Sequence, residues 1–171
     1  MRILVAVADV DALVRRSSAI DGHAGANTTS VYTAAEIFPM LPEKLSTDLT
    51  SLNEGQARLA MIFEMVIAAD GTVAESDVYR GVVLNKAKLA YHAVAPFLEG
   101  KAPAPPKVAA VGGLDGQLRI QDRAAQAMRG LRHQHGALGL ETIQSRAVFN
   151  GDVLDDLRRD ERDRAKDLIE D

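Results

Sequence analysis

The feature that most constrains the fold is a pair of long runs, each expected to form a strand, separated by a short turn. They cover residues 59–67 and 73–84, on either side of Asp70-Gly71. Asp-Gly is favoured in tight hairpin turns because both residues tolerate positive φ angles. The spacing therefore predicts an antiparallel β-hairpin, and the chain has to form a sheet around it.

Upstream of this hairpin, the sequence predicts one strand and one long loop. Residues 3–8 form a continuous apolar run, which is typical of a strand buried on both faces. Residues 18–53 are rich in Gly, Ser, Thr, Asn and Pro, and they predict an ordered loop with short helical turns, one of them opening at Pro42-Glu43. A loop of this length inside a compact domain usually serves a function.

Downstream of the hairpin, the pattern alternates between helices and a second hairpin. Helices are expected over residues 86–98 and 114–135, and a hairpin is expected around Asn150-Gly151. A charged helix is predicted from Asp160 to the end, with an apolar stripe that begins only at Leu168-Ile169. The predicted fold class is therefore α+β, with a mixed and mostly antiparallel sheet flanked by helices.

The composition fits a single soluble domain of 171 residues, 47% apolar and 26% charged. The chain has no cysteine, which excludes disulfides and thiolate metal sites and suits a cytoplasmic protein. No apolar run approaches the roughly 18 residues that a membrane span needs, so no membrane is expected as a partner. The net charge of −4 argues mildly against a dedicated nucleic-acid binder, because phosphate contacts need clustered Lys and Arg.

One stretch of the long loop carries a motif of high specificity. It begins with Thr29-Ser30-Val31-Tyr32 and continues, after a spacer, with FPMLPEKLSTDLTSLN at residues 38–53. This stretch resembles the T-S-V-Y and I-P-M-L-P-E-x-L-S-x-D-L-C-S-L-N segments of the RNB family, the exoribonucleases of the ribonuclease II and ribonuclease R type. Further segments that match the family in order and spacing are Val7-Ala8-Asp9-Val10, Lys88-Leu89-Ala90-Tyr91, Gly136-Ala137-Leu138 and Leu168-Ile169-Glu170-Asp171.

The resemblance implies a 3′→5′ exoribonuclease that hydrolyses single-stranded RNA to nucleoside monophosphates, with Mg²⁺ held by clustered aspartates. In the family the aspartate run precedes the I-A-D-V strand, and an arginine-bearing S-P-I-R segment comes later; the 171 residues contain neither. We therefore expect residues 1–171 to be a partial RNB catalytic domain, truncated at both ends. By itself it should be inactive, without a catalytic residue or metal site of its own, and it should self-associate through its cut ends.

The same resemblance implies three RNA-binding residues. Tyr32 corresponds to the aromatic residue against which the 3′-terminal base packs, and such stacking contributes about 1–3 kcal/mol per base. Tyr91 is expected either to contact RNA or to pack in the core. Glu170 matches the first glutamate of the family's L-I-E-E motif, which helps to fix the terminal nucleotide. Leu140 lies where many members have a second aromatic residue, which leaves a one-sided clamp.

Other charged residues have a structural interpretation beside the functional one. Asp9 and Asp11 could chelate a metal, but two carboxylates make a weak site and we favour structural hydrogen bonding. His133 and His135 are expected to interact with a helix dipole rather than a metal. The arginines of the second helix could follow phosphates or simply face solvent: Arg119, Arg123, Arg129 and Arg132.

Two other functions stay open beside the exonuclease. The first is an RNA-binding or regulatory module without catalysis. The second is a structural subunit that completes its sheet with a partner chain, because the opening strand would leave an unpaired edge.

Overall fold

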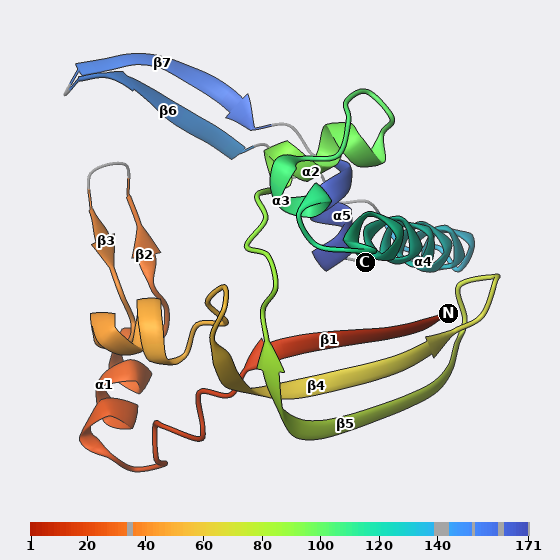
Figure 1. Ribbon diagram of the computed structural model, residues 1–171. Helices are drawn as coiled ribbons and strands as arrows, with labels where there is room; N and C mark the ends of the chain where they lie inside the picture. Colours follow the sequence, from red (N-terminus) through yellow and green to blue (C-terminus); the bar gives the residue numbers. More distant parts are fainter. Residues whose placement is uncertain (34–35, 139–143, 152, 161–162, 171) are drawn as a thin grey trace. The chain divides into compact units, whose positions relative to one another are not determined.

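The computed structural model describes residues 1–33, 36–138, 144–151, 153–160 and 163–170 (Figure 1). The chain divides into two compact units. The sheet unit comprises Arg2–Val66 and Glu75–Lys88, and the helical unit comprises Met1, Ile67–Ala74 and Leu89–Asp171. Among the described residues, no helix is both long and apolar enough to span a membrane.

The sheet unit is built on the hairpin that the sequence predicts. Strand β4 (Ala57–Ile67) lies between β5 (Val73–Leu84) and β1 (Arg2–Ala8) in the order β1-β4-β5. Strand β1 pairs antiparallel with β4, and the register runs from Arg2 opposite Val66 to Ala8 opposite Ala60. Figure 1 shows the three strands side by side. The predicted hairpin is therefore confirmed.

The turn between β4 and β5 is wider than the tight turn predicted at Asp70-Gly71. The Ala68 N–H donates to the Thr72 carbonyl oxygen (2.9 Å), so the loop contains more than two residues. Gly71 adopts a φ of +92°, the left-handed conformation that the sequence predicts. The Asp70 carboxylate accepts a hydrogen bond from the Thr72 N–H (2.9 Å), and this bond lowers the pKa of Asp70 below its ordinary value.

Strand β1 is an edge strand, and the prediction that it is buried on both faces is wrong. Leu4, Val5 and Val7 are 51%, 43% and 52% exposed. Within the described part of the chain, β4 alone pairs with β1. A continuous apolar run indicates that a strand can be covered on both faces, but it does not identify what covers it. Self-association through this edge stays a prediction.

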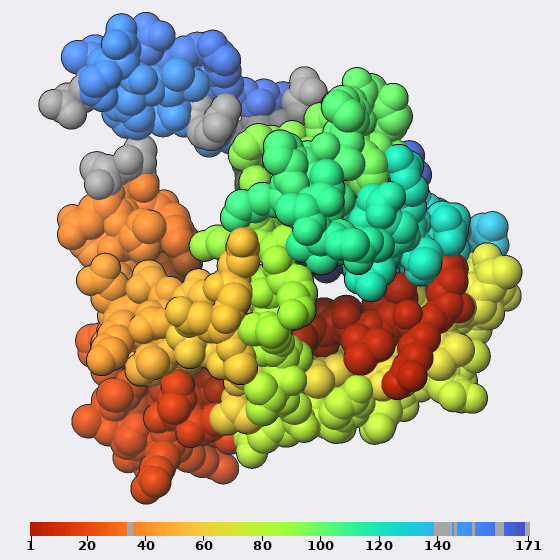
Figure 2. All heavy atoms as spheres, in the orientation of Figure 1, coloured from red at the N-terminus to blue at the C-terminus, as the bar shows by residue number. Residues whose placement is uncertain are grey.

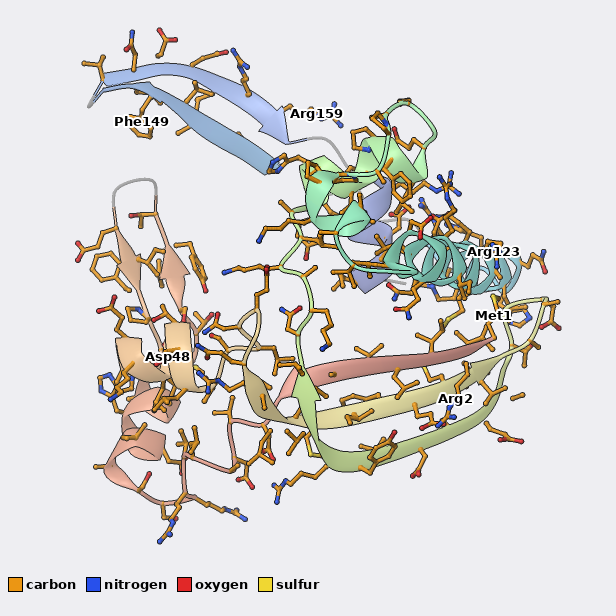
Figure 3. The ribbon with its side chains drawn as sticks, in the orientation of Figure 1. Met1, Arg2, Asp48, Arg123, Phe149 and Arg159 are labelled. Atoms are coloured by element: carbon orange, nitrogen blue, oxygen red, sulfur yellow. The ribbon has the colours of Figure 1, made fainter. Side chains whose placement is uncertain are left out.

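A row of polar side chains crosses the sheet from β1 to β5. The Arg2 Nε lies 2.5 Å from Glu64 Oε1, and the Tyr79 hydroxyl donates to Glu64 Oε2 (2.9 Å). Arg2 is labelled in Figure 3. The hydrogen bond with Arg2, followed by the one with Tyr79, lowers the pKa of Glu64 below its ordinary value of 4.5. The hydrogen bond with Glu64 raises the pKa of Tyr79 above its ordinary value of 10.0.

This polar row predicts a pH dependence of stability. Because the pKa of Glu64 is lower in the folded chain, its carboxylate stabilises the fold above pH 4.5 and loses this effect as the pH falls through the folded-state pKa. The thermal midpoints of the chain and of Glu64→Gln should therefore differ most near neutral pH and converge in acid. Glu75→Gln, which removes an exposed carboxylate, is the control. A Glu64→Gln difference that persists undiminished to about pH 2 would contradict the assignment.

The stretch over residues 18–53 is more regular than the predicted loop. It contains the helix α1 (Ala19–Asn27), the strands β2 (Val31–Tyr32) and β3 (Ile37–Phe38), and the π-helix η1 (Leu45–Leu49). The helical turn expected at Pro42-Glu43 is confirmed, because helical structure begins at Glu43 and runs into η1.

Helix α1 was not predicted because none of its residues is buried and no apolar stripe reveals it. Ser18 begins the helix by accepting a hydrogen bond from the Asp21 N–H (3.2 Å). Beneath this region lies a small core of Val14, Leu41 and Leu45, against which Ala24 and Met40 pack.

The helical unit surrounds one apolar core with four helices. They are α2 (Tyr91–Leu98), α3 (Pro106–Ala109), α4 (Leu114–Gln134) and α5 (Arg164–Glu170). The core residues are Val94, Ala95, Phe97, Leu98, Val108, Leu118 and Ala165, so every one of these helices contributes. Helix α4 confirms the predicted helix over residues 114–135.

Helix α2 ends where the sequence predicts but begins later, at Tyr91 instead of residue 86. Gly100 follows the helix with a φ of +73°, as a helix-ending glycine does. The residues before the helix are held outside it by hydrogen bonds to side chains. The Asn85 Oδ1 accepts from the Ala87 N–H (3.0 Å), and a Glu54 carboxylate oxygen accepts from the Lys88 N–H (2.8 Å).

The second predicted hairpin is confirmed, but the helix expected from Asp160 is partly wrong. Strand β6 (Gln144–Asn150) pairs antiparallel with β7 (Val153–Asp160), and their atoms are the blue group at the upper left of Figure 2. The strand reaches Asp160, opposite Gln144, and α5 starts only at Arg164. Pairing with β6 overrides the helical tendency of the charged residues in this segment.

Candidate functional site

The hairpin of β2 and β3 presents Tyr32 to solvent. The two strands pair antiparallel, with Val31 opposite Phe38 and Tyr32 opposite Ile37. Tyr32 is 76% exposed, and the other three side chains are 49–57% exposed. An aromatic ring in this position can stack with a flat partner such as a nucleobase.

Hydrogen bonds hold the hairpin at both ends. Near its turn, the Thr33 N–H donates to the Glu36 carbonyl oxygen (3.0 Å), and the Thr33 Oγ1 accepts from the Glu36 N–H (2.9 Å). At its base, the Ser30 Oγ accepts from the Met40 N–H (2.9 Å). Since Met40 also packs against the small core, the hairpin that carries Tyr32 is anchored to the motif that follows it.

The motif over residues 38–53 forms its own hydrogen-bonded turn. Four hydroxyl groups donate to backbone carbonyl oxygens: Ser46 to Leu41 (2.8 Å), Thr47 to Glu43 (2.9 Å), Thr50 to Leu45 (2.7 Å) and Ser51 to Ser46 (3.2 Å). All but the Thr47 bond reach back five residues, which is the spacing of a π-helix. Arg58 Nη2 donates to Asp48 Oδ1 (2.8 Å), and this bond connects the turn to β4. Asp48 is labelled in Figure 3. The motif therefore specifies a backbone shape.

The acidic pair at the end of β1 is bound by an arginine. Asp9 is 5% exposed, and its Oδ1 accepts a hydrogen bond from the Ala12 N–H (3.2 Å). The Arg80 Nε lies 2.5 Å from Asp9 Oδ2, and its Nη2 lies 3.6 Å from Asp11 Oδ2. The hydrogen bond predicted for Asp9 is confirmed, and Arg80 brings a positive charge to both carboxylates.

The described residues do not form a magnesium site. Magnesium is held by oxygen ligands, mainly carboxylates, in near-octahedral geometry. In the described part of the chain, no three His, Asp or Glu side chains are grouped so that they could hold a metal ion. The residues present therefore do not fit Mg²⁺, and no chemical step in this chain is assigned to a metal.

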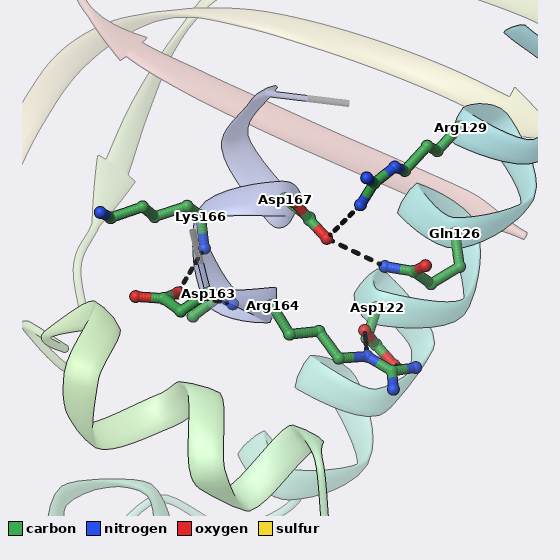
Figure 4. A network of polar contacts seen from close by, with 8 residues as sticks. Asp122, Gln126, Arg129, Asp163, Arg164, Lys166 and Asp167 are labelled. Carbon is green, nitrogen blue, oxygen red and sulfur yellow. Dashed lines mark hydrogen bonds and ion pairs between the residues drawn. The ribbon is translucent and has the colours of Figure 1, made fainter. Parts of the chain in front are cut away.

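Two ion pairs fasten α5 to α4 (Figure 4). The Arg164 guanidinium donates to both oxygens of Asp122, with Nε–Oδ1 at 2.6 Å and Nη2–Oδ2 at 2.9 Å. Arg129 Nη1 donates to Asp167 Oδ2 (2.8 Å). Both carboxylates are buried, Asp122 at 6% exposed and Asp167 at 5%. The hydrogen bonds that Arg164 donates to Asp122 raise the pKa of Arg164 above its ordinary value.

The charged residues at the start of α5 make specific contacts. Asp163 Oδ1 accepts from the N–H groups of Ala165 (3.0 Å) and Lys166 (2.9 Å), so Asp163 caps the helix. Arg164 is bound by Asp122. The sequence signal for this arrangement is a charged residue, Asp122, between Leu118 and Ala125 on the apolar face of α4.

The sequence and the fold of the chain are similar to those of known proteins. The sequence pattern of the RNB domain matches residues 1–171. The chain belongs to the RNB family. Ribonuclease R of Vibrio parahaemolyticus is 35% identical over 155 residues, which cover 88% of this chain and 18% of that protein. The chain thus spans about a fifth of the length of the curated relatives that it matches.

Solved structures agree with the RNB assignment and confirm the α+β fold. RNase R of Mycoplasma genitalium, in complex with ribose-methylated single-stranded RNA, is 26% identical with a TM-score of 0.86 over 99% of this chain and 26% of that chain. The same protein in complex with double-stranded RNA gives a TM-score of 0.87. Yeast Ssd1, a pseudonuclease, shares the fold alone, with a TM-score of 0.66 and 15% identity over 99% of this chain and 20% of its own.

The remaining candidate residues of this RNB chain differ in their surroundings. Tyr91 begins α2 and is 49% exposed, so it is not a core residue, and its contact with RNA stays a prediction. Glu170 is the last residue of α5, but its side chain lies outside the described part of the structure. Leu140 lies outside the described residues altogether.

The arginines of α4 differ in their contacts. Arg119 lies over the Phe97 ring, 4.4 Å from its centroid, and Arg129 binds Asp167. Arg123, labelled in Figure 3, is exposed. His133 lies in the last turn of α4, where the predicted interaction with the helix dipole remains a prediction.

Proposed function

We propose that this chain is the part of an RNB-family 3′→5′ exoribonuclease that holds the 3′ end of single-stranded RNA. In the complete enzyme that RNA is hydrolysed to nucleoside monophosphates. The observation that supports this function is the exposed Tyr32 ring, carried by a hairpin that is anchored to the RNB motif. Stacking tolerates any base, which suits an enzyme that degrades RNA processively. The likeness to an RNase R solved with single-stranded RNA supports RNA as the partner.

In this proposal the chain binds RNA and other parts of the enzyme carry out hydrolysis. By family resemblance the cofactor is Mg²⁺ on an aspartate run, which the 171 residues do not contain. We assign Tyr32, Tyr91 and Glu170 as RNA contacts and assign no catalytic residue. We accordingly expect the 171-residue chain to release no mononucleotides by itself. The lack of cysteine supports a cytoplasmic location.

Binding of a short RNA tests the proposed function directly. The probe is a single-stranded oligo(A) RNA with 2-aminopurine at its 3′ end, whose fluorescence falls when the base stacks. Tyr32→Ala should weaken binding by about 1–3 kcal/mol, roughly 5- to 150-fold, and should abolish the quenching at saturation. Tyr32→Phe keeps the ring and should bind like the parent chain.

The controls separate a stacking residue from a packing residue. Far-ultraviolet circular dichroism checks that each variant is folded. Binding of a long RNA should change less than binding of the short probe, because many phosphate contacts share the affinity there. Equal affinity and equal quenching for the parent chain and Tyr32→Ala would refute the assignment of Tyr32.

A further inference from the structure

The β2–β3 hairpin has two distinct faces. Side chains that lie directly opposite each other in an antiparallel pair project from the same face. Tyr32 therefore shares one face with Ile37, and Val31 shares the other with Phe38. Each face thus presents one aromatic and one β-branched aliphatic side chain, both of them substantially exposed.

Tyr32 and Ile37 form the closer of the two pairs. The Thr33 N–H donates to the Glu36 carbonyl oxygen, so the adjoining pair of Tyr32 and Ile37 is of the non-hydrogen-bonded type. Cα atoms in such a pair are about 4.5 Å apart, against about 5.5 Å in a hydrogen-bonded pair, and the side chains are closer too. The Ile37 side chain is therefore the cross-strand neighbour of the Tyr32 ring.

Both side chains of this pair are exposed to solvent. Tyr32 is 76% exposed and Ile37 is 57% exposed. Neither belongs to the small core of Val14, Leu41 and Leu45, so they are available to a partner. Covering an exposed aliphatic side chain beside a stacked base gains hydrophobic free energy in addition to the stacking itself.

We propose that Ile37 is a further RNA-contacting residue, which extends the Tyr32 ring into one platform for the 3′-terminal nucleoside. This inference rests on the function proposed above. A purine has two fused rings and reaches beyond a tyrosine ring, so it covers Ile37 as well. A single-ring pyrimidine stacks on Tyr32 and covers less of Ile37. The platform therefore favours RNA that ends in a purine.

Binding of two RNAs to the 171-residue chain tests the platform. They share one sequence and end in either adenosine or uridine. Burial of one methylene group contributes roughly a factor of four in affinity, so Ile37→Ala should weaken binding of the adenosine-ended RNA by about fivefold or more. The uridine-ended RNA should change little. Ile37→Phe enlarges the apolar surface and should strengthen binding of the adenosine-ended RNA.

The chain offers a matched control on the opposite face. Val31→Ala shortens a similar side chain, 49% exposed, in the same hairpin. It should leave the affinities for both RNAs unchanged. Equal effects of Ile37→Ala and Val31→Ala, with Tyr32→Ala still weakening binding, would overturn the platform and leave the proposed function standing. No effect of Tyr32→Ala would instead overturn the proposed function.

If Ile37→Ala only disrupted the hairpin, it would weaken binding of both RNAs, whichever base they end in. If Ile37→Ala weakens the adenosine- and uridine-ended RNAs equally, and Ile37→Phe does not strengthen binding, then Ile37 only supports the hairpin and the inference is wrong. A selective loss with Ile37→Ala, together with a gain with Ile37→Phe, establishes contact with the terminal base.

Discussion

Gly71→Ala is expected to destabilise the helical unit by about 3 kcal/mol. Gly71 has a φ of +92°, which costs a residue with a Cβ about 1–2 kcal/mol. An added Cβ would also lie 2.3 Å from the Ala127 carbonyl oxygen and 2.8 Å from the Met128 nitrogen. Both are backbone atoms of α4 and cannot rotate away, so either the turn or the helix has to move.

A second glycine separates conformational strain from the steric clash. Gly100 has a φ of +73°, and a Cβ added there would meet no atom within 4 Å. Gly100→Ala should therefore show the conformational cost alone, about 1 kcal/mol. Urea denaturation of both variants gives the difference, which we expect to be about 2 kcal/mol. Equal destabilisation by the two substitutions would mean that the turn does not pack on α4.

Asp122→Ala should have the next largest effect, a loss of about 2 kcal/mol in the free energy of unfolding. The substitution removes the partner of both Arg164 hydrogen bonds and leaves the guanidinium without its counter-charge. Loss of a fully buried ion-pair partner costs more, about 3–5 kcal/mol. The Arg164 side chain is 39% exposed, so water compensates part of the loss. Urea denaturation measures the effect.

An exposed ion pair provides the matched control for Asp122→Ala. The Asp156 and Arg158 side chains are 55% and 65% exposed and lie 3.4 Å apart. Asp156→Ala should cost less than about 0.5 kcal/mol. Asp122→Asn, which keeps an oxygen acceptor for Arg164, should fall between the two alanine variants. If Asp122→Ala were as mild as Asp156→Ala, the Asp122–Arg164 pair would not hold α5 in place.

Elements with strong local signals could be predicted from the sequence. The β4–β5 hairpin follows from two strand-forming runs and the Asp-Gly pair between them. Helix α4 follows from its repeating apolar residues and ends at Gln134, next to the expected residue 135. In both cases the information lies within a single window of sequence, so distant contacts add little.

Elements that depend on distant contacts could not be predicted. The late start of α2 depends on Glu54, which lies far away in the sequence and binds the Lys88 N–H. The extension of β7 to Asp160 depends on its pairing with Gln144. A helix and a strand compete in such segments, and the partner that decides between them is not visible in the local pattern.

Only part of the candidate site could be predicted from the sequence. The resemblance identified Tyr32 because the motif surrounds it directly. The position of Ile37 on the same face requires the register of β2 and β3, which two-residue strands do not reveal. The Asp9–Arg80 ion pair likewise joins the end of β1 to β5, and no spacing within either segment predicts it.

The hydrogen-bonded turn at residues 38–53 affects how far this signature can separate active enzymes from inactive relatives. Its hydroxyl groups bind the carbonyl oxygens of the same segment, so the shape of the turn does not require a metal site beside it. A pseudonuclease such as yeast Ssd1 already shares the fold. Searches that depend on this stretch will therefore collect active enzymes and inactive relatives together. The aspartate run is the part of the sequence to inspect when the two are sorted.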